Sequence, residues 1–436
     1  MHVLPQLREL EHRYPDTVAI IGVESGKFHA ERVTSRVRDA ALRLGNTHPI
    51  VNDRQFRIWR SYAVNAWPTL VVVDPDGRVL GTHAGEFTVE MLAPLIDRLI
   101  ADHAAAGSLQ RRERAPIADA PTMAPGVLRY PGKLAVDGTR IAIADSGHHR
   151  VLVGRLDADG TRVHVERVAG TGTAGYDDGP RGAFDSPQGV VFGKLHPDGG
   201  PLYVADAGSH TIRAVELDTG AISTIAGTGH QLRSAADRRA GALSSPWDLT
   251  LVNHTLYIAM AGVHQLWSLD LHGGTARVHS GTGAETLADG PHDAAALAQP
   301  MGIDAMGDRL YFTDAESSAV RWADATPAGT VGTIVGTGLF DFGDQDGVGD
   351  DVRLQHAQGI AWHAPSGRLL VADSYNDALK WIDPRTRRAV SWVRGLHEPA
   401  GVACGDRAAY VADTNAHRIV RVAYDSGAVQ EVEVEE

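Results

Sequence analysis

The chain has 436 residues, 43% of them hydrophobic and 22% charged, and its formal net charge is −13. This composition is ordinary for a globular protein, and the acidic balance argues against a nucleic-acid-binding surface. The longest apolar runs are strand-sized, far below the roughly 20 residues that span a bilayer, so we expect no membrane partner.

Cys404 is the single cysteine, which excludes an internal disulfide and a cysteine-based metal cluster. The first residues also lack a basic stretch followed by an apolar core, the pattern of a secretory signal peptide. Together these features favour a cytoplasmic protein.

Strands and helices are predicted to alternate through residues 1–104. Apolar runs indicate buried strands, and apolar side chains at a spacing of three and four indicate helices. In chain order, the expected elements are a strand at 17–23, a helix at 30–44, an extended piece at 48–51, a helix at 55–62, a hairpin with strands at 67–74 and 79–81, and a helix at 89–104.

This order resembles the thioredoxin fold. Trp67, Pro68 and Thr69 enter their strand as the cis-proline element of that family does. The resemblance implies a cis peptide bond before Pro68, and it implies that Trp67 and Pro68 face a substrate. On the residues alone, cis bonds are uncommon, and the alternative is a proline that only begins a strand.

The dithiol of that family has no counterpart here, so we predict no catalytic residue in this chain. In the family the dithiol lies at the N-terminus of a helix, where the helix dipole lowers the pKa of a cysteine. The segment from Met1 to Leu10 resembles the part of that helix after the second cysteine. The preceding strand, central in the family's sheet, is missing too. We therefore expect unpaired backbone groups in the sheet, and we interpret Met1 as an internal methionine of a longer product; the alternative is a natural remnant.

From about residue 130 the chain aligns with itself as six repeats. Each repeat opens with a short strand that is a variant of Pro-x-Gly-Val, and most end in a glycine-rich turn such as Gly170-Thr171-Gly172. The openings begin at Pro131, Pro187, Pro246, Pro300, Ala357 and Pro399. Four short strands per repeat, at a period of roughly 40 to 60 residues, indicate the blades of a propeller.

Five repeats end their second strand with an aspartate, and the third has Met260 there instead. The aspartates are Asp145, Asp206, Asp314, Asp373 and Asp413. We predict a structural role, in which the carboxylate accepts backbone N–H groups of the following turn and lies near the next His or Arg. The Gly- and Asp-rich segments between repeats, such as 176–180 and 341–347, do not match a twelve-residue calcium loop, and we predict solvated turns there.

The recurrent Pro-x-Gly-Val, Val-Ala-Asp and His-Arg-Ile elements resemble the NHL repeat. The resemblance implies an all-β six-bladed propeller of the NHL type over residues 127–436, preceded by a linker at 105–126 and a truncated α/β thioredoxin-like domain at 1–104. Over nearly the whole chain, this layout resembles the family of NHL repeat-containing protein two.

Three functions fit these features. The preferred hypothesis is a non-catalytic interaction protein whose propeller rim binds a protein or peptide. The alternative is a thiol-disulfide oxidoreductase in cell redox homeostasis, if the true start lies upstream and restores a Cys-x-x-Cys. A third hypothesis, an enzyme with a metal in the propeller channel, would use Asp248, Asp304, His363 and Cys404. No paired metal-ligand spacing occurs, however, and we predict neither a metal nor a cofactor.

Overall fold

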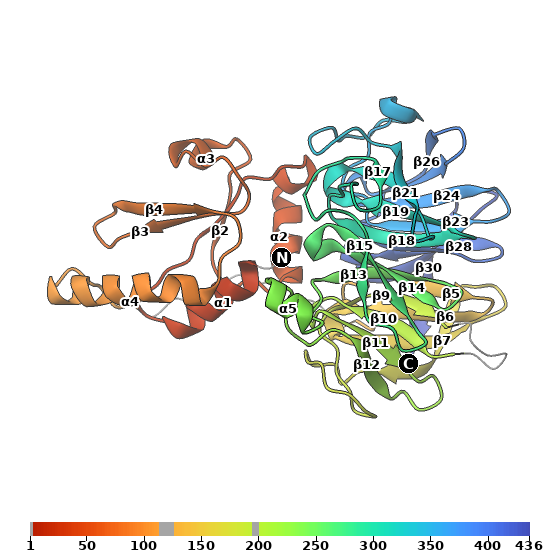
Figure 1. Ribbon diagram of the computed structural model, residues 1–436, viewed down its shortest axis with the longest axis horizontal. Coiled ribbons are helices and arrows are strands. Elements are labelled where there is room, and N and C mark those ends of the chain that lie inside the picture. The colour runs from red at the N-terminus through yellow and green to blue at the C-terminus, as the bar shows by residue number, and fades with distance from the viewer. Residues whose placement is uncertain (1–2, 113–125, 194–199) are drawn as a thin grey trace. The chain divides into compact units, whose positions relative to one another are not determined.

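The computed structural model describes residues 3–112, 126–193 and 200–436 (Figure 1). The chain divides into two compact units, Met1–Ala124 and Pro125–Glu436. Most of the predicted linker at 105–126, and the start of the helix that the resemblance implies at 1–10, lie outside the described residues, so the predicted domain boundaries stay predictions. None of the described helices combines the length and the apolar character needed to cross a bilayer.

The first unit alternates helices and strands. Its elements are α1 (Val3–Arg13), β1 (Gly22–Glu24), η1 (Ala30–Arg32), α2 (Thr34–Arg43), β2 (Ile50–Asn52), α3 (Arg57–Ser61), β3 (Thr69–Val73), β4 (Val79–Ala84) and α4 (Val89–Ala105). The last helix confirms the predicted element to within one residue. The predicted helix at 30–44 is divided, because the extended backbone of Val33 separates the 3-10 turn η1 from α2.

The strands of the first unit form two separate sheets. β1 pairs in parallel with β2, and β3 pairs antiparallel with β4. The strand predicted at 17–23 is wrong over most of its length, because β1 has only the three-residue β2 beside it in the described structure. No described strand joins β1 to β3, and apolar side chains around β1 are exposed, Ile21 to 63% and Val23 to 42%.

The core of the first unit lies between its two long helices and β3. Leu10 of α1 and Tyr14, the residue after that helix, are buried against Phe87 and Val89 at the start of α4. The Tyr14 hydroxyl donates a 2.7 Å hydrogen bond to the carboxylate of Asp97 on α4. Leu70 of β3 packs against the same cluster, so the two helices and this strand share one core.

The second unit consists almost entirely of antiparallel strands that follow the sequence repeats. Repeat 1 contains β5 (Leu134–Asp137), β6 (Arg140–Asp145), β7 (Arg150–Leu156) and β8 (Arg162–Ala169); repeat 2 contains β9 (Pro187–Phe192), β10 (Leu202–Asp206), β11 (Thr211–Val215) and β12 (Ile222–Ala226). Repeat 3 contains β13 (Pro246–Val252), β14 (Thr255–Met260), β15 (Gln265–Asp270) and β16 (Arg277–Ser280), preceded by the short helix α5 (Ala235–Arg239). Repeat 4 contains β18 (Pro300–Met306), β19 (Arg309–Asp314), β20 (Ala319–Asp324) and β21 (Thr330–Val335).

Repeats 5 and 6 have the same order of strands. Repeat 5 contains β23 (Gly359–His363), β24 (Arg368–Asp373), β25 (Ala378–Asp383) and β26 (Arg388–Arg394); repeat 6 contains β27 (Pro399–Cys404), β28 (Ala408–Asp413), β29 (Arg418–Ala423) and β30 (Val429–Glu435). The two-residue strands β17 (Gly290–Pro291) and β22 (Gly347–Val348) add to the outer edges of repeats 4 and 5. Five repeats have a 3-10 turn after the second strand: η2 (Ser146–His148), η3 (Ala261–Val263), η4 (Ala315–Ser317), η6 (Ser374–Asn376) and η7 (Thr414–Ala416).

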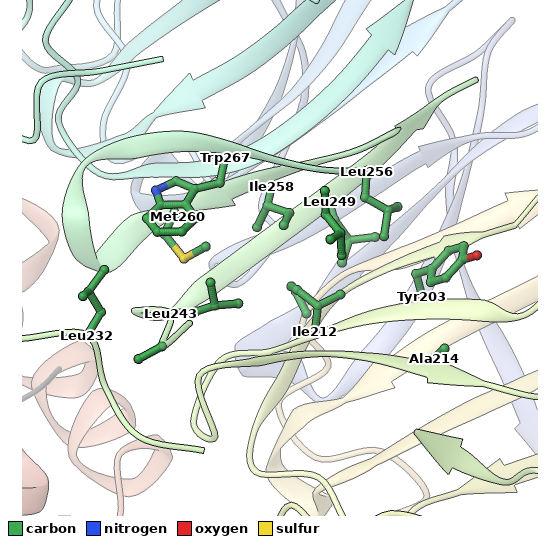
Figure 2. Close-up of a cluster of buried hydrophobic side chains, with 13 residues drawn as sticks. Tyr203, Ile212, Ala214, Leu232, Leu243, Leu249, Leu256, Ile258, Met260 and Trp267 are labelled. Carbon is green, nitrogen blue, oxygen red and sulfur yellow. The ribbon is translucent and has the colours of Figure 1, made fainter. Parts of the chain in front are cut away.

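The two ends of the repeat array meet. β30 completes repeat 6 antiparallel to β29, and its last residues, Glu433 to Glu435, pair in parallel with β8 of repeat 1. Buried apolar clusters join each repeat to the next, and one of them joins repeat 6 to repeat 1. Figure 2 shows the cluster between repeats 2 and 3, where Ile212 and Tyr203 pack with Leu249 and Ile258.

Candidate functional site

The five repeated aspartates are all fully buried at the end of their second strands. Each carboxylate accepts a hydrogen bond from a backbone N–H in the segment that leads into the first strand of the same repeat. The donors are the N–H groups of Arg129, Asp185, Ala298, Gln355 and His397, bonded to Asp145, Asp206, Asp314, Asp373 and Asp413, respectively. The sequence predicted that the N–H donors lie in the turn after each aspartate. They lie before it instead, because the entry segment passes the end of the neighbouring second strand.

A cation on the third strand faces each aspartate, in one of two positions. In repeats 1 and 6 it is the first residue of that strand: Arg150 Nε lies 2.8 Å from Asp145, and Arg418 Nη2 lies 2.9 Å from Asp413. In repeats 2, 4 and 5 the cation is completely buried, and the residues are Arg213, Arg321 and Lys380. Burial raises the pKa of the carboxyls that face them, while the neighbouring cation opposes that rise.

The buried cations also hold the Asp-rich loops between repeats. Arg321 donates to Asp314 at 3.0 Å, to Asp289 at 2.9 Å and to the carbonyl oxygens of Ala288 and Ala296. Asp289 in turn accepts from both the N–H and the hydroxyl of Thr333 on β21. Repeats 2 and 5 use Asp178 and Asp346 in the same way. These three acids are exposed, with side-chain exposures of 52%, 46% and 40%, which agrees with the prediction of solvated turns. They also tie each loop to the outer strand.

A second set of side chains connects neighbouring repeats. The residue after each 3-10 turn, or after the equivalent turn of repeat 2, has a positive φ and faces the residue before the next repeat's opening strand. In five repeats its side chain accepts that residue's N–H: His149 from Ser186, His210 from Ser245, Ser318 from His356, Asp377 from Glu398, and His417 from Tyr130. We call these five bonds the latches. The bond to Tyr130 connects repeat 6 to repeat 1.

The candidates for a channel metal site have protein partners instead. Asp248 accepts the N–H groups of Leu249 and Ile303, and Asp304 accepts those of Ala305 and Trp362. His363 bonds the hydroxyl of Ser366 at 2.7 Å and packs on the rings of Tyr424 and Trp381. Burial raises the pKa of Cys404 to about 12, so its thiol is not poised as a nucleophile. The described residues contain no group of three or more His, Cys, Asp or Glu side chains arranged to hold a metal ion.

Sequence reasoning missed a buried lysine, Lys133, in the opening of repeat 1. Lys133 occupies the position that is Gly in four of the six openings, and its ammonium group donates to the carbonyl oxygens of Gln358 and, at 2.6 Å, Ala400. Burial lowers the pKa of Lys133, and the charge of Asp248 opposes this effect. The signal was a Gly-to-Lys change within an otherwise regular opening.

In the first unit, the predicted cis peptide bond between Trp67 and Pro68 is confirmed. The Trp67 ring is 47% exposed, and its Nε1 donates a 2.8 Å hydrogen bond to the carbonyl oxygen of Ser25. Its centroid lies 4.5 Å from that of Trp59 and 6.5 Å from that of Phe56. We call Phe56, Trp59 and Trp67 the aromatic surface; the first two were not identified from the sequence, because it is the folded chain that brings their rings to Trp67.

Asp53 fixes the backbone under this aromatic surface. Its buried carboxylate accepts the N–H groups of Arg57 at 2.8 Å and Trp59 at 2.9 Å, and the hydroxyl of Ser25 at 3.0 Å. Burial alone would raise the pKa of Asp53, but these hydrogen bonds outweigh it and lower the pKa. The short helix α3 is thus anchored at its N-terminus, with Trp59 held against Trp67.

Known proteins resemble the chain in both units. A family described as "Thioredoxin-like" matches residues 1–79. NHL repeat-containing protein 2 of Gallus gallus is 35% identical over 96% of this chain and 64% of its own length, and that of Homo sapiens is 34% identical over the same shares. The "Protein SUPPRESSOR OF QUENCHING 1, chloroplastic" of Arabidopsis thaliana is 35% identical over 99% of this chain and 44% of its own length. Among solved structures, a nidogen/laminin complex aligns with 66% of this chain at 14% identity and a TM-score of 0.47.

These findings and the geometry define a class: a mostly-β protein in which a thioredoxin-like domain is joined to a β-propeller of NHL repeats. Within that class, the chain is similar over 96% of its length to NHL repeat-containing protein 2 of Gallus gallus, Bos taurus and Homo sapiens. It spans somewhat less than two thirds of the length of the curated relatives of that name, 64% in the chicken protein.

Proposed function

We propose that this chain is a non-catalytic interaction protein, in which the propeller loops and the thioredoxin-like domain bind a protein or peptide. The observation that supports this most is the use of the buried charges: all five repeated aspartates accept a backbone N–H and pair with a cation of their own repeat. Such residues stabilise a scaffold and leave its loops for recognition. Trp67 and Pro68 are the residues we propose to face the partner on the first unit.

We further propose that the six repeats form six blades of a closed ring over residues 127–436. The parallel pairing of β30 with β8 and the latch from His417 to Tyr130 support closure between repeats 6 and 1. A linker at 105–126 and a thioredoxin-like domain at 1–104 complete the proposed layout. We also propose a cytoplasmic location, on the basis of the single cysteine.

Site-specific photocrosslinking from the full chain tests the interaction role. A benzophenone amino acid at Phe340, which is 70% exposed in the loop between repeats 4 and 5, should yield a discrete crosslinked partner in cell extract. The same probe at Val429, 42% exposed on the outer strand β30, is the matched control. The proposal would be refuted if probes at Phe340 and Val429 gave the same crosslinking pattern and a probe at Trp67 gave no crosslinked partner.

A redox function in a longer form is the second candidate. The thioredoxin-like match favours it, and the relatives extend beyond the length of this chain. In this candidate, a form that carries an upstream Cys-x-x-Cys acts as a thiol-disulfide oxidoreductase. Reduction of insulin disulfides by the longer form, and none by the 436-residue chain, is the expected result; turnover by the 436-residue chain would contradict both candidates.

A further inference from the structure

The region around the aromatic surface has a charge opposite to that of the protein. Residues 27–60 contain eight Lys and Arg but three Asp and Glu, whereas the whole chain has a net charge of −13. One of those three acids, Asp53, is buried and accepts backbone and hydroxyl hydrogen bonds, so it offers little charge to solvent. The segment that carries Phe56 and Trp59 therefore has a net positive charge.

Two arginines at α3 are available to a partner. Arg54 and Arg57 are exposed, and neither side chain has a hydrogen-bond or ion-pair partner among the described residues. Arg32, in contrast, is used internally: its guanidinium donates to the carbonyl oxygens of Gly26 and Lys27 and lies 5.2 Å from the centroid of Phe56. Arg57 begins α3, directly after Phe56 and two residues before Trp59, so its backbone lies within one helical turn of both aromatic residues.

The backbone here is held in an unfavourable conformation. Phe56 and Ala63, on either side of α3, have φ values of 57° and 53°, in the left-handed region that costs a non-glycine residue roughly 1 kcal/mol or more. Asp53 and the hydrogen bond from Trp67 to Ser25 keep this geometry in place. Strained backbone that is supported in this way is typical of binding sites.

We infer that the aromatic surface, with Arg54 and Arg57, binds an acidic peptide segment of a partner protein. Arginine pairs with carboxylates through two parallel hydrogen bonds, and exposed Trp and Arg are the residues that contribute most to binding at interfaces. Nucleic acid fits less well, because its affinity depends on how many phosphates are neutralised, and Arg54 and Arg57 supply only two guanidinium groups at α3. The inference rests on the proposed role of Trp67 and Pro68, and it specifies the charge of their partner.

Fluorescence polarisation with the full chain tests the inference. The probes are three labelled twelve-residue peptides that share one Phe and one Pro and differ only in carrying six Glu, six Gln or six Lys. We expect the Glu peptide to bind at least tenfold more tightly than the Gln peptide, and the Lys peptide not to bind. Binding of the Glu peptide should weaken about tenfold in Arg54→Gln/Arg57→Gln and in Trp67→Ala, and it should weaken with salt. Arg78→Gln, which removes a 76% exposed charge at the tip of the β3–β4 hairpin, is the matched control.

The outcomes separate this inference from the proposed function. The inference that the peptide is acidic would be overturned by equal binding of the Glu and Gln peptides. It would also be overturned by equal losses of affinity for the Glu peptide in Arg78→Gln and Arg54→Gln/Arg57→Gln. Either result would leave an interaction site at Trp67. Tighter binding of a twelve-nucleotide single-stranded DNA than of the Glu peptide would overturn it in favour of nucleic acid. Binding of no peptide at millimolar concentration would overturn the inference, while the crosslinks from Phe340 would still decide the wider proposal.

Discussion

Repeats 3 and 4 are neighbours with the same strand order, but different chemistry stabilises the ends of their second strands. In repeat 4, Asp314 pairs with the buried Arg321. In repeat 3, Met260 and Trp267 occupy the two equivalent positions, 0% and 3% exposed, within the apolar cluster of Figure 2. Both members of the ion pair are thus replaced by apolar residues.

The comparison shows that the two positions act as a unit. A buried ion pair can be exchanged for apolar residues of similar volume at little cost, whereas loss of one partner leaves an uncompensated charge. Repeat 3 also lacks a latch, because the buried Nδ1 of its His264 has no hydrogen-bond partner in the described structure. Repeat 3 therefore has the same fold with fewer polar contacts, and the other repeats can be tested against it.

The largest effect is expected where the ion pair of repeat 4 is broken. Arg321→Met leaves the buried Asp314 without its cation and removes the donor to Ala288 and Ala296, so the free energy of unfolding should fall by about 3–5 kcal/mol. Urea unfolding followed by circular dichroism measures this loss.

The double variant Asp314→Met/Arg321→Met is the matched control, because it imitates the apolar solution of repeat 3. It should recover a large part of the stability that the single variant loses. If the double variant is as unstable as Arg321→Met, then the two positions do not act as a unit, and the comparison of the repeats fails.

A smaller effect is expected at the third residue of the repeat 4 opening. Repeat 3 has Asp248 at this position, but a Cβ on Gly302 would lie 2.4 Å from the carbonyl oxygen of Gln358. Gly302→Ala should therefore cost about 1–3 kcal/mol through backbone displacement. Gly343→Ala, where the nearest atom is a side-chain carbon of Arg353 at 3.4 Å, should be nearly neutral in the same urea titration. Equal costs would show that close packing does not explain the glycine.

The sequence predicted the repeats because their strands alternate regularly and their openings recur, as at Pro187 and Pro300. It also located the buried aspartates, but it assigned them the wrong backbone donors, since the entry segment that supplies those donors precedes them by 16 to 21 residues. The aromatic surface could not be predicted, because tertiary packing brings Phe56 and Trp59 to Trp67. In the first unit, strand 17–23 was overpredicted because apolar sequence alone does not supply a pairing partner.

Acid should destabilise the junction of repeats 3 and 4 through His279 on β16. Burial lowers the pKa of His279 to about 4, and its Nε2 lies 2.8 Å from the carbonyl oxygen of Asp324, with His292 and Arg277 nearby. Because this pKa is below the unfolded value of about 6.5, the unfolded state binds more protons at acidic pH. The contribution of neutral His279 to the free energy of unfolding is complete above about pH 6.5. It is lost as pH falls toward 4, by at most about 1.4 kcal/mol per pH unit.

Urea midpoints at pH 7, 6 and 5 measure this dependence, and His279→Gln isolates it from the aspartates. The glutamine amide can still donate to the carbonyl of Asp324 but does not titrate in this range. The variant should therefore lose less stability on acidification than the unmodified protein. Identical slopes would exclude His279 as the group responsible.

The smallest expected effect compares the latch of repeat 6 with the missing latch of repeat 3. His417→Ala removes the acceptor of the Tyr130 N–H, a 3.0 Å hydrogen bond, and should cost about 1 kcal/mol. His264→Ala removes a ring whose Nδ1 has no partner, so it should cost clearly less. The two residues have φ values of 56° and 54°, so the backbone penalty for alanine is the same in both and cancels in the comparison. Urea unfolding of the two variants side by side decides the point: if His264→Ala is as destabilising as His417→Ala, the latch hydrogen bond contributes nothing beyond the packing of the ring.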